Sequence, residues 1–184
     1  MSDAASLLAV MAAERDIERA LHTYCRAIDR RDPELLRTVY HDDAIDDHGG
    51  AFIGGPDGYV TWVIDHLEHF VSTMHTLQNT LIDVDISSGV ARSESYCVAH
   101  HVRPGSDDDL VMDVFGCRYV DRFERREAGV WKIAHRVVVA EWRLRQPMLS
   151  EADQPQGFYR GTRDRSDLVY ATDLPDRTAP SSVT

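Results

Sequence analysis

The sequence predicts an α+β fold in which a curved antiparallel sheet wraps around N-terminal helices. Apolar residues recur at three- and four-residue spacing up to about residue 71, which is typical of amphipathic helices. From His75 onward, apolar and polar residues alternate in long segments joined by short turns, which is typical of antiparallel strands. Helices followed by a meander of strands define an α+β domain.

The first helix is predicted from an apolar stripe that Asp29 extends. The stripe consists of Leu7, Leu8, Met11, Ile17, Leu21, Tyr24, Cys25 and Ile28. Asp32 then supplies an N-cap and Pro33 the first position of a short second helix. Residues 43–52 are polar and extended, and a turn at residues 54–58 precedes a third helix at residues 59–71.

The strands that follow His75 are separated by turns rich in Gly, Ser, Pro and Asp. After the turn at residues 87–89, long strands are expected at residues 90–102, 110–125 and 130–144. We therefore expect one α+β domain at residues 1–146. Residues 147–184 form an extended tail, which carries Phe158 and Tyr159.

Composition excludes several classes of partner. The chain of 184 residues has 20 Lys and Arg against 31 Asp and Glu, a net charge of -11, so we expect no nucleic acid and no anionic membrane as partner. No apolar run suits a membrane span, and the start lacks signal-peptide features, which predicts a cytoplasmic protein. The three cysteines form no Cys-x-x-Cys motif and are expected to be core thiols.

Asp29 at a helix end and His75 at a strand start are the best candidates for catalysis. A carboxylate that holds a histidine in one tautomer makes that histidine a usable base near neutral pH. The alternative is structural, because Asp29 could cap its helix and His75 could be a satisfied core histidine. The helix that carries His66 and His69 lacks zinc-site spacing and is expected to be a solvated face without a metal.

Three segments carry a resemblance to a known family. Residues 24–32, residues 72–75 with Asn79 after them, and residues 125–133 resemble the SnoaL-like branch of the nuclear transport factor 2-like superfamily. The likeness spans about residues 14–142. It is strongest to the group that contains scytalone dehydratase, hexachlorocyclohexane dehydrochlorinase and bile-acid dehydratase, and it implies a cone-shaped α+β barrel with one pocket per subunit.

The resemblance also implies roles for individual residues. The family's Asp–His dyad falls on Asp29 and His75, a tyrosine of the bile-acid enzymes on Tyr24, and a second pocket histidine on His100. The chain departs from scytalone dehydratase where two water-orienting tyrosines fall on Ile28 and His48. A strand asparagine of that enzyme falls near Val120, with Arg118 close by. The resemblance therefore implies the elimination chemistry of the family more directly than it implies a particular substrate.

Several of these assignments have alternatives. His100 or its neighbour His101 must face the interior, and the bulkier face of that strand favours His100 unless a bulge exchanges them. Tyr24 lies about 140° round the helix from Asp29 and could be a core aromatic. His48 could lie at the pocket rim or in a solvated loop.

The function predicted is a lyase that acts by proton abstraction and elimination. His75, polarised by Asp29, removes a proton next to a carbonyl or leaving group, and His100 or Tyr24 assists departure of that group. The substrate is expected to be a small hydrophobic molecule of aromatic, polyketide, terpenoid or steroid type, with no cofactor. The alternatives are an isomerase or cyclase, or a non-catalytic ligand-binding or oxygenase-subunit role.

Assembly and the tail complete the predictions. Long strands have a second face that needs covering, so we expect a homo-oligomer, a trimer rather than a dimer. The large side chains of the tail predict that part of it docks over the pocket mouth as a lid or on a neighbouring subunit as a strap. Phe158 and Tyr159 would then contact substrate.

Overall fold

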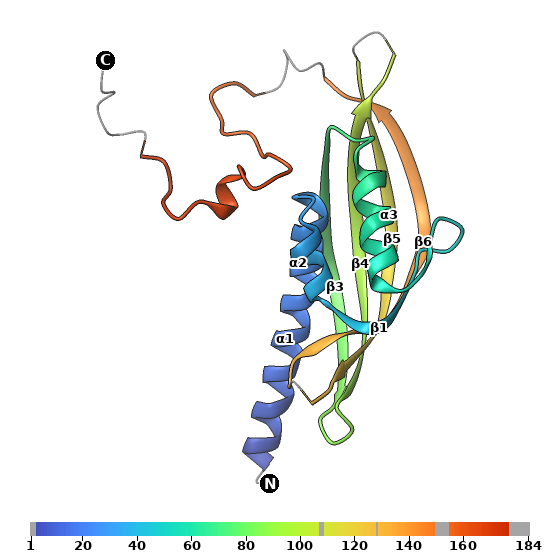
Figure 1. Cartoon of the computed structure of the whole chain (residues 1–184), viewed down its shortest axis with the longest axis vertical. Helices are drawn as coiled ribbons and strands as arrows, with labels where there is room; N and C mark the ends of the chain where they lie inside the picture. The colour runs from blue at the N-terminus through green and yellow to red at the C-terminus, as the bar shows by residue number, and fades with distance from the viewer. Residues whose placement is uncertain (1–2, 107–108, 128, 150–154, 177–184) are drawn as a thin grey trace.

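The computed structural model describes residues 3–106, 109–127, 129–149 and 155–176. It confirms the predicted fold class, because N-terminal helices lie against a curved, unclosed, mainly antiparallel sheet (Figure 1). The elements are, in chain order, α1 (Asp3–Asp29), α2 (Pro33–Thr38), β1 (Tyr40–Asp47), β2 (Ile53–Gly54), α3 (Pro56–Leu67), β3 (Ser72–Asp85), β4 (Val90–Pro104), β5 (Leu110–Arg125), β6 (Trp131–Pro147) and a short 3-10 helix, η2 (Leu168–Tyr170).

The six strands are ordered β2-β1-β6-β5-β4-β3. Strands β3 to β6 form the predicted antiparallel meander, with His75 opposite Ala99 and Cys97 opposite Cys117. The parallel pairing of β1 with β6 was not predicted. This pairing places β1 beside β6, after α2 in the chain. Strand β1 and helix α3 then cover one side of the inner face of the sheet (Figure 1).

The capping signals predicted for α2 are confirmed, whereas α3 is displaced toward the N-terminus from its predicted range and ends at Leu67. The Asp32 carboxylate accepts a hydrogen bond from the backbone N–H of Leu35 at 3.0 Å, which caps α2, and Pro33 occupies its first turn. Helix α3 begins at Pro56, three residues earlier than predicted, because Pro56 needs no hydrogen-bond partner for a backbone N–H in the first turn. None of the helices in the described part of the chain is long and apolar enough to cross a membrane.

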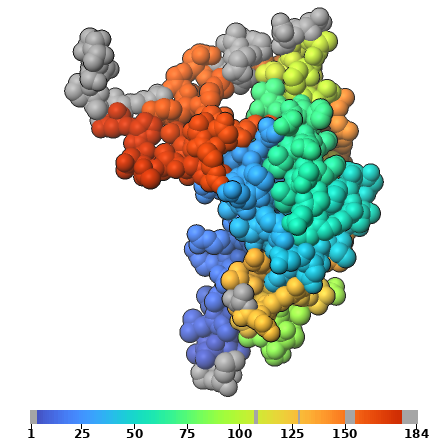
Figure 2. All heavy atoms as spheres, viewed as in Figure 1, coloured from blue at the N-terminus to red at the C-terminus, as the bar shows by residue number. Residues whose placement is uncertain are grey.

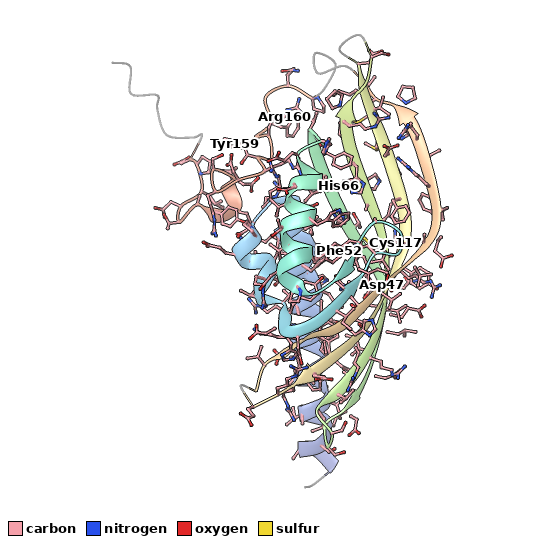
Figure 3. All side chains as sticks on the ribbon, turned by 45° about the vertical axis from the view of Figure 1, so that its right-hand side comes forward. Asp47, Phe52, His66, Cys117, Tyr159 and Arg160 are labelled. Carbon is pink, nitrogen blue, oxygen red and sulfur yellow. The ribbon has the colours of Figure 1, made fainter. Side chains whose placement is uncertain are left out.

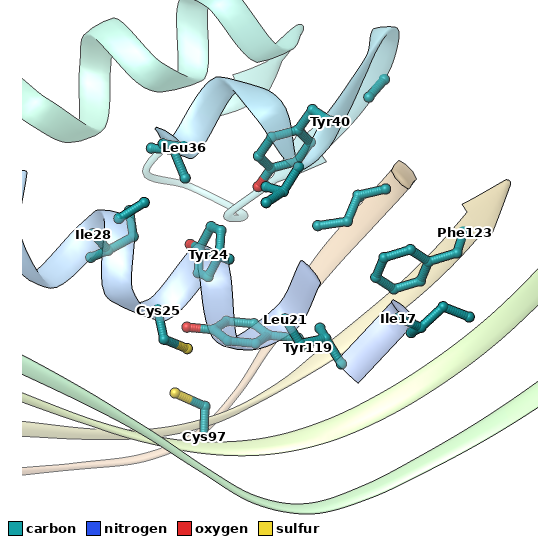
Figure 4. Packing of buried hydrophobic residues seen from close by; sticks show 14 of the residues in the cluster. Ile17, Leu21, Tyr24, Cys25, Ile28, Leu36, Tyr40, Cys97, Tyr119 and Phe123 are labelled. Atoms are coloured by element: carbon teal, nitrogen blue, oxygen red, sulfur yellow. The ribbon is translucent and has the colours of Figure 1, made fainter. Parts of the chain in front are cut away.

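Of the predicted apolar stripe of α1, Leu7, Leu8 and Met11 are exposed, and only the part from Ile17 to Ile28 packs into the cone. Figure 4 shows this packing for Leu21, Tyr24 and Ile28. Each of these side chains is almost fully buried, and burial of such a side chain stabilises the fold by roughly 1.5–3 kcal/mol. The facing residues of β4 are small, and Cys97 and Ala99 are almost fully buried. Small side chains here let the helix approach the sheet and leave space farther up the cone.

A buried ion pair crosses the inner face of the sheet. Arg136 on β6 donates two hydrogen bonds of 2.7 Å to the two carboxylate oxygens of Asp121 on β5, and both residues are buried. The guanidinium lies 4.2 Å from the ring centroid of Tyr24 and 4.3 Å from that of Tyr119. Removal of either charged partner would leave an uncompensated buried charge, at a cost of about 3–5 kcal/mol.

The described part of the tail packs on the helices of its own chain. Arg163 donates to the backbone carbonyl of Phe70 at 2.6 Å, Tyr170 donates to Asp32 at 2.8 Å, and Arg30 contacts Asp167 at 2.6 Å. In Figure 2 the tail, in orange and red, forms a lobe beside α2. Polar contacts rather than apolar packing therefore hold it.

Candidate active site

A cavity of about 400 Å³ lies between the inner face of the sheet and helices α1 and α3. Its walls are mainly aromatic. They include Tyr24, Tyr59, Trp62, Phe70, Phe115 and Tyr119, together with His48, His66, His75 and His101. A cavity of this size with an apolar lining and a few polar groups is typical of a small-molecule site.

Asp29 and His75 meet at the wall of this cavity. The last residue of α1, Asp29, accepts a hydrogen bond from His75 Nδ1 at 2.8 Å and one from the Thr73 hydroxyl at 3.0 Å, both through Oδ1. Its other oxygen accepts from the backbone N–H of His75 at 3.0 Å. Since an ionised carboxylate only accepts hydrogen bonds, Nδ1 carries the proton in the neutral imidazole. His75 Nε2 is then left with a lone pair toward the cavity.

Two opposing effects set the protonation of His75. Burial lowers the pKa of the imidazole, but the hydrogen bond and the negative charge of Asp29 outweigh burial, and the net result is a pKa above the ordinary value of 6.5. Asp29 thus both fixes the tautomer and raises the basicity of His75. The predicted proximity of the two residues is seen in the structure.

The histidine of β4 that lines the cavity is His101, and the prediction that favoured His100 is wrong. The His101 ring meets the His75 ring edge to face, with centroids 5.3 Å apart. His100 points to the other face of β4 and does not line the cavity. The bulkier face of β4 is its outer face because α1 leaves room only for small residues inside. Burial, and then the nearby His75, lower the pKa of His101 to about 4, so it is neutral at pH 7.

Tyr24 and His48 form another wall. The Tyr24 hydroxyl lies 2.5 Å from the Tyr59 hydroxyl, and burial raises the pKa of Tyr24 well above 10. His48 stacks on Tyr59 with centroids 4.9 Å apart, and its Nδ1 is hydrogen-bonded to the buried carboxylate of Asp46. Asp46 also accepts from the Tyr40 hydroxyl at 2.6 Å.

Asp46–His48 is therefore a second Asp–His pair on the same cavity, and sequence reasoning missed it. The two residues are separated by one position at the end of β1. That spacing places both side chains on one face of an extended segment, so the signal was present in the sequence.

Three other predicted site residues lie outside the cavity. Arg118 is on the outer face of β5, where it contacts Glu94 at 2.5 Å and Glu141 at 2.7 Å. Its position follows from strand alternation, because Cys117 and Tyr119 point inward. Phe158 and Tyr159 are 74% and 50% exposed and do not line the cavity. In Figure 3 Tyr159 lies on the tail, away from His66 and Cys117.

Helix α3 contributes more to the cavity than predicted. His66 is exposed, as predicted, but it also lines the cavity and stacks on Trp62, with centroids 5.3 Å apart, which was not predicted. His69 is exposed, as predicted. Among the described residues, no group of three or more His, Cys, Asp or Glu side chains could hold a metal ion.

The cone-shaped fold is that of the nuclear transport factor 2-like superfamily. Within it, the chain belongs to the SnoaL-like domain family, which matches residues 9–137. A search of curated protein sequences found no match.

Solved structures give the same fold at low sequence identity. A proposed scytalone dehydratase from Novosphingobium aromaticivorans is 22% identical, with a TM-score of 0.64 over 83% of this chain and 98% of that chain. Hexachlorocyclohexane dehydrochlorinase LinA type 2 is 18% identical, with a TM-score of 0.67 over 82% and 99%. The LinA-type3 enzyme from Novosphingobium barchaimii is 17% identical, with a TM-score of 0.63 over 77% and 93%. These likenesses establish the fold.

Proposed function

We propose that the protein is a cofactor-independent lyase that eliminates water or a similar leaving group from a small hydrophobic molecule. The observation that carries the proposal is the Asp29–His75 pair at the wall of an aromatic cavity, with His75 Nε2 directed inward. The names of two structural relatives, a dehydratase and a dehydrochlorinase, fit the same reaction class.

The proposed reaction begins at His75. Its Nε2 removes a proton from a carbon next to a carbonyl or leaving group, and the ionised Asp29 stabilises the imidazolium that forms. The electron pair of the broken C–H bond forms the new double bond as the leaving group departs. A departing hydroxide takes a proton and leaves as water.

The proton donor for the leaving group comes from the part of the wall that Tyr24 and His48 form. Since the raised pKa of Tyr24 keeps its hydroxyl protonated, Tyr24 can donate, and His48 held by Asp46 is a second candidate. His100 is excluded from this role because it does not line the cavity. The aromatic walls would bind the flat apolar part of the substrate.

An isomerase would use the same base and return the proton to another atom, and a ligand-binding protein would use the cavity alone. To distinguish these functions, the protein is incubated with a panel of aromatic hydroxy-carbonyl and halogenated compounds, and the products are measured by mass spectrometry. A lyase gives products that have lost water or hydrogen halide, whereas an isomerase gives products of unchanged mass.

The matched variants are His75→Ala and His100→Ala, which truncate histidines on neighbouring strands. His75→Ala should lower turnover at least ~100-fold with the fold intact. His100→Ala should retain near-wild-type turnover. Equal activity of wild type and His75→Ala would refute the assignment of the base, and the absence of any conversion across the panel would favour ligand binding.

A further inference from the structure

Three arginines surround one carboxylate at the edge of the cavity. They are Arg103 on β4 and Arg143 and Arg145 on β6, and the carboxylate is Asp113 on β5. We call these four residues the arginine rim. Asp113 and Arg143 are themselves part of the cavity wall.

All four side chains lie on the inner face of the sheet. Asp113 is opposite His101 on β4 and Arg145 on β6, and Arg143 is opposite Phe115, so the alternation of the strands places them with residues that line the cavity. The ends of β4, β5 and β6 that carry the rim extend past α3 (Figure 1). A ligand that fills the cavity would therefore lie beside Asp113 and Arg143 of the rim.

The positive charge of the rim exceeds the single negative charge of Asp113. Arg145 alone makes a bidentate pair with the carboxylate, at 2.5 and 2.9 Å, and Arg103 and Arg143 each add one hydrogen bond of 3.1 Å. The hydrogen bond from Arg145 is the main cause of an Asp113 pKa far below its usual range, so the carboxylate is ionised. Three guanidiniums against one carboxylate leave an excess of two positive charges.

Much of this charge is accessible to a ligand. The side chains of Arg143 and Arg145 are 60% and 52% exposed, whereas that of Asp113 is 8% exposed. A guanidinium has five N–H donors, so donors remain after the bonds to Asp113 are made. Among the described residues, no second carboxylate is hydrogen-bonded to these arginines. In a chain with net charge -11, such a cluster creates a local site that attracts anions.

We propose that the arginine rim binds an anionic group of the substrate, a carboxylate, sulfonate or phosphate, while the apolar body of the same molecule occupies the aromatic cavity. Guanidinium groups bind such anions through paired, charge-assisted hydrogen bonds. That this ligand is a substrate rests on the function proposed above, whereas the binding of an amphiphilic anion to the rim and cavity does not depend on catalysis. A purely structural rim would need only the Arg145–Asp113 pair.

Two fluorescent probes with one aromatic framework test the proposal. 8-Anilinonaphthalene-1-sulfonate carries a sulfonate, and N-phenyl-1-naphthylamine is the neutral counterpart. The dissociation constant of each probe is measured by fluorescence titration at low and high salt. The wild type should bind the sulfonate probe more tightly than the neutral probe. High salt should weaken the binding of the sulfonate probe only.

The test variant is Arg143→Gln with Arg145→Gln, and the control is Arg118→Gln with Arg122→Gln. Both remove two positive charges, but Arg118 and Arg122 lie outside the cavity. In the test variant, the dissociation constant of the sulfonate probe should rise about 10-fold or more, because charge-assisted hydrogen bonds are lost. The dissociation constant of the neutral probe should not change. The control should bind both probes as the wild type does.

Equal loss of both probes, or loss of sulfonate binding in the control as well, would overturn the proposal. If the double variant does not fold, Arg143→Gln alone gives the same test, since it leaves the bidentate Arg145 pair in place. Sulfonate binding that depends on the rim in a protein that converts no compound would uphold the anion site and refute the lyase.

Discussion

Replacement of Asp29 by asparagine should reverse the tautomer of His75 while leaving the fold intact. Asp29 accepts from three donors, the His75 backbone N–H at Oδ2 and both His75 Nδ1 and the Thr73 hydroxyl at Oδ1. An asparagine offers one oxygen and one NH₂ group in the same places. Because the backbone N–H can only donate, we expect the amide oxygen to face it and the NH₂ group to face His75 Nδ1.

His75 Nδ1 must then accept a hydrogen bond, which moves the imidazole proton to Nε2. A protonated Nε2 cannot remove a proton from a ligand, so turnover should fall about 10⁴-fold, the order of loss that a wrong histidine tautomer causes in serine proteases. The Thr73 hydroxyl can rotate to accept from the NH₂ group. The stability cost is therefore limited to the weakening of charge-assisted hydrogen bonds, about 1–3 kcal/mol.

Long-range ¹H–¹⁵N NMR measures the tautomer without a substrate, because the two ring nitrogens have different shifts when they carry the proton. At a pH where His75 is neutral, the wild type should show a protonated Nδ1 and Asp29→Asn a protonated Nε2. Asp16→Asn makes the same chemical change on an exposed position of α1 and should leave His75 unchanged. A protonated Nδ1 in Asp29→Asn would refute the reasoning.

Further predictions concern the pH profile, the second pair, assembly and the tail. The raised pKa of His75 predicts that kcat/KM increases with pH through a value above 6.5, and a kcat/KM that does not change in that range would contradict this. The contribution of His75 to the free energy of unfolding should be full below pH 6.5 and should decrease as the pH rises through the raised pKa, and a free energy of unfolding that stays constant there would contradict this. His48→Ala should lower kcat ~10-fold or more with a smaller change in KM, and a change in KM alone would make His48 a binding residue. Tyr96 and Trp142, exposed on the outer face of the sheet, predict a homo-oligomer, favoured as a trimer, which light scattering at micromolar concentration checks. Truncation after Pro147 should give a folded protein, and unchanged KM and kcat would exclude a lid role for the tail.

The arrangement of helices and sheet could be predicted because it depends on local patterns. The stripe of α1, the cap at Asp32 and the alternation in the long strands each determine an element within a few residues. The parallel pairing of β1 with β6 could not be predicted in this way. It joins segments about 90 residues apart, and no local pattern specifies such a partner.

The candidate site shows the same limit. Asp29 and His75 were identified through their context in a family motif, whereas the choice between His100 and His101 depended on which face of β4 meets α1. Bulk suggested the wrong face, since the packed helix leaves room only for small side chains inside. The arginine rim draws one carboxylate and three guanidiniums from three strands, so its residues become a cluster only when the register is known.

The most direct test of the central claim is a kinetic isotope effect at the carbon from which His75 removes the proton. For a compound that the panel identifies as converted, turnover is compared between the ordinary substrate and one with deuterium at that carbon, in wild type and in Asp29→Asn. We expect slower turnover of the deuterated substrate by the wild type and almost no turnover by the variant. Equal rates for both substrates in single-turnover experiments, with Asp29→Asn as active as the wild type, would contradict proton abstraction by this pair.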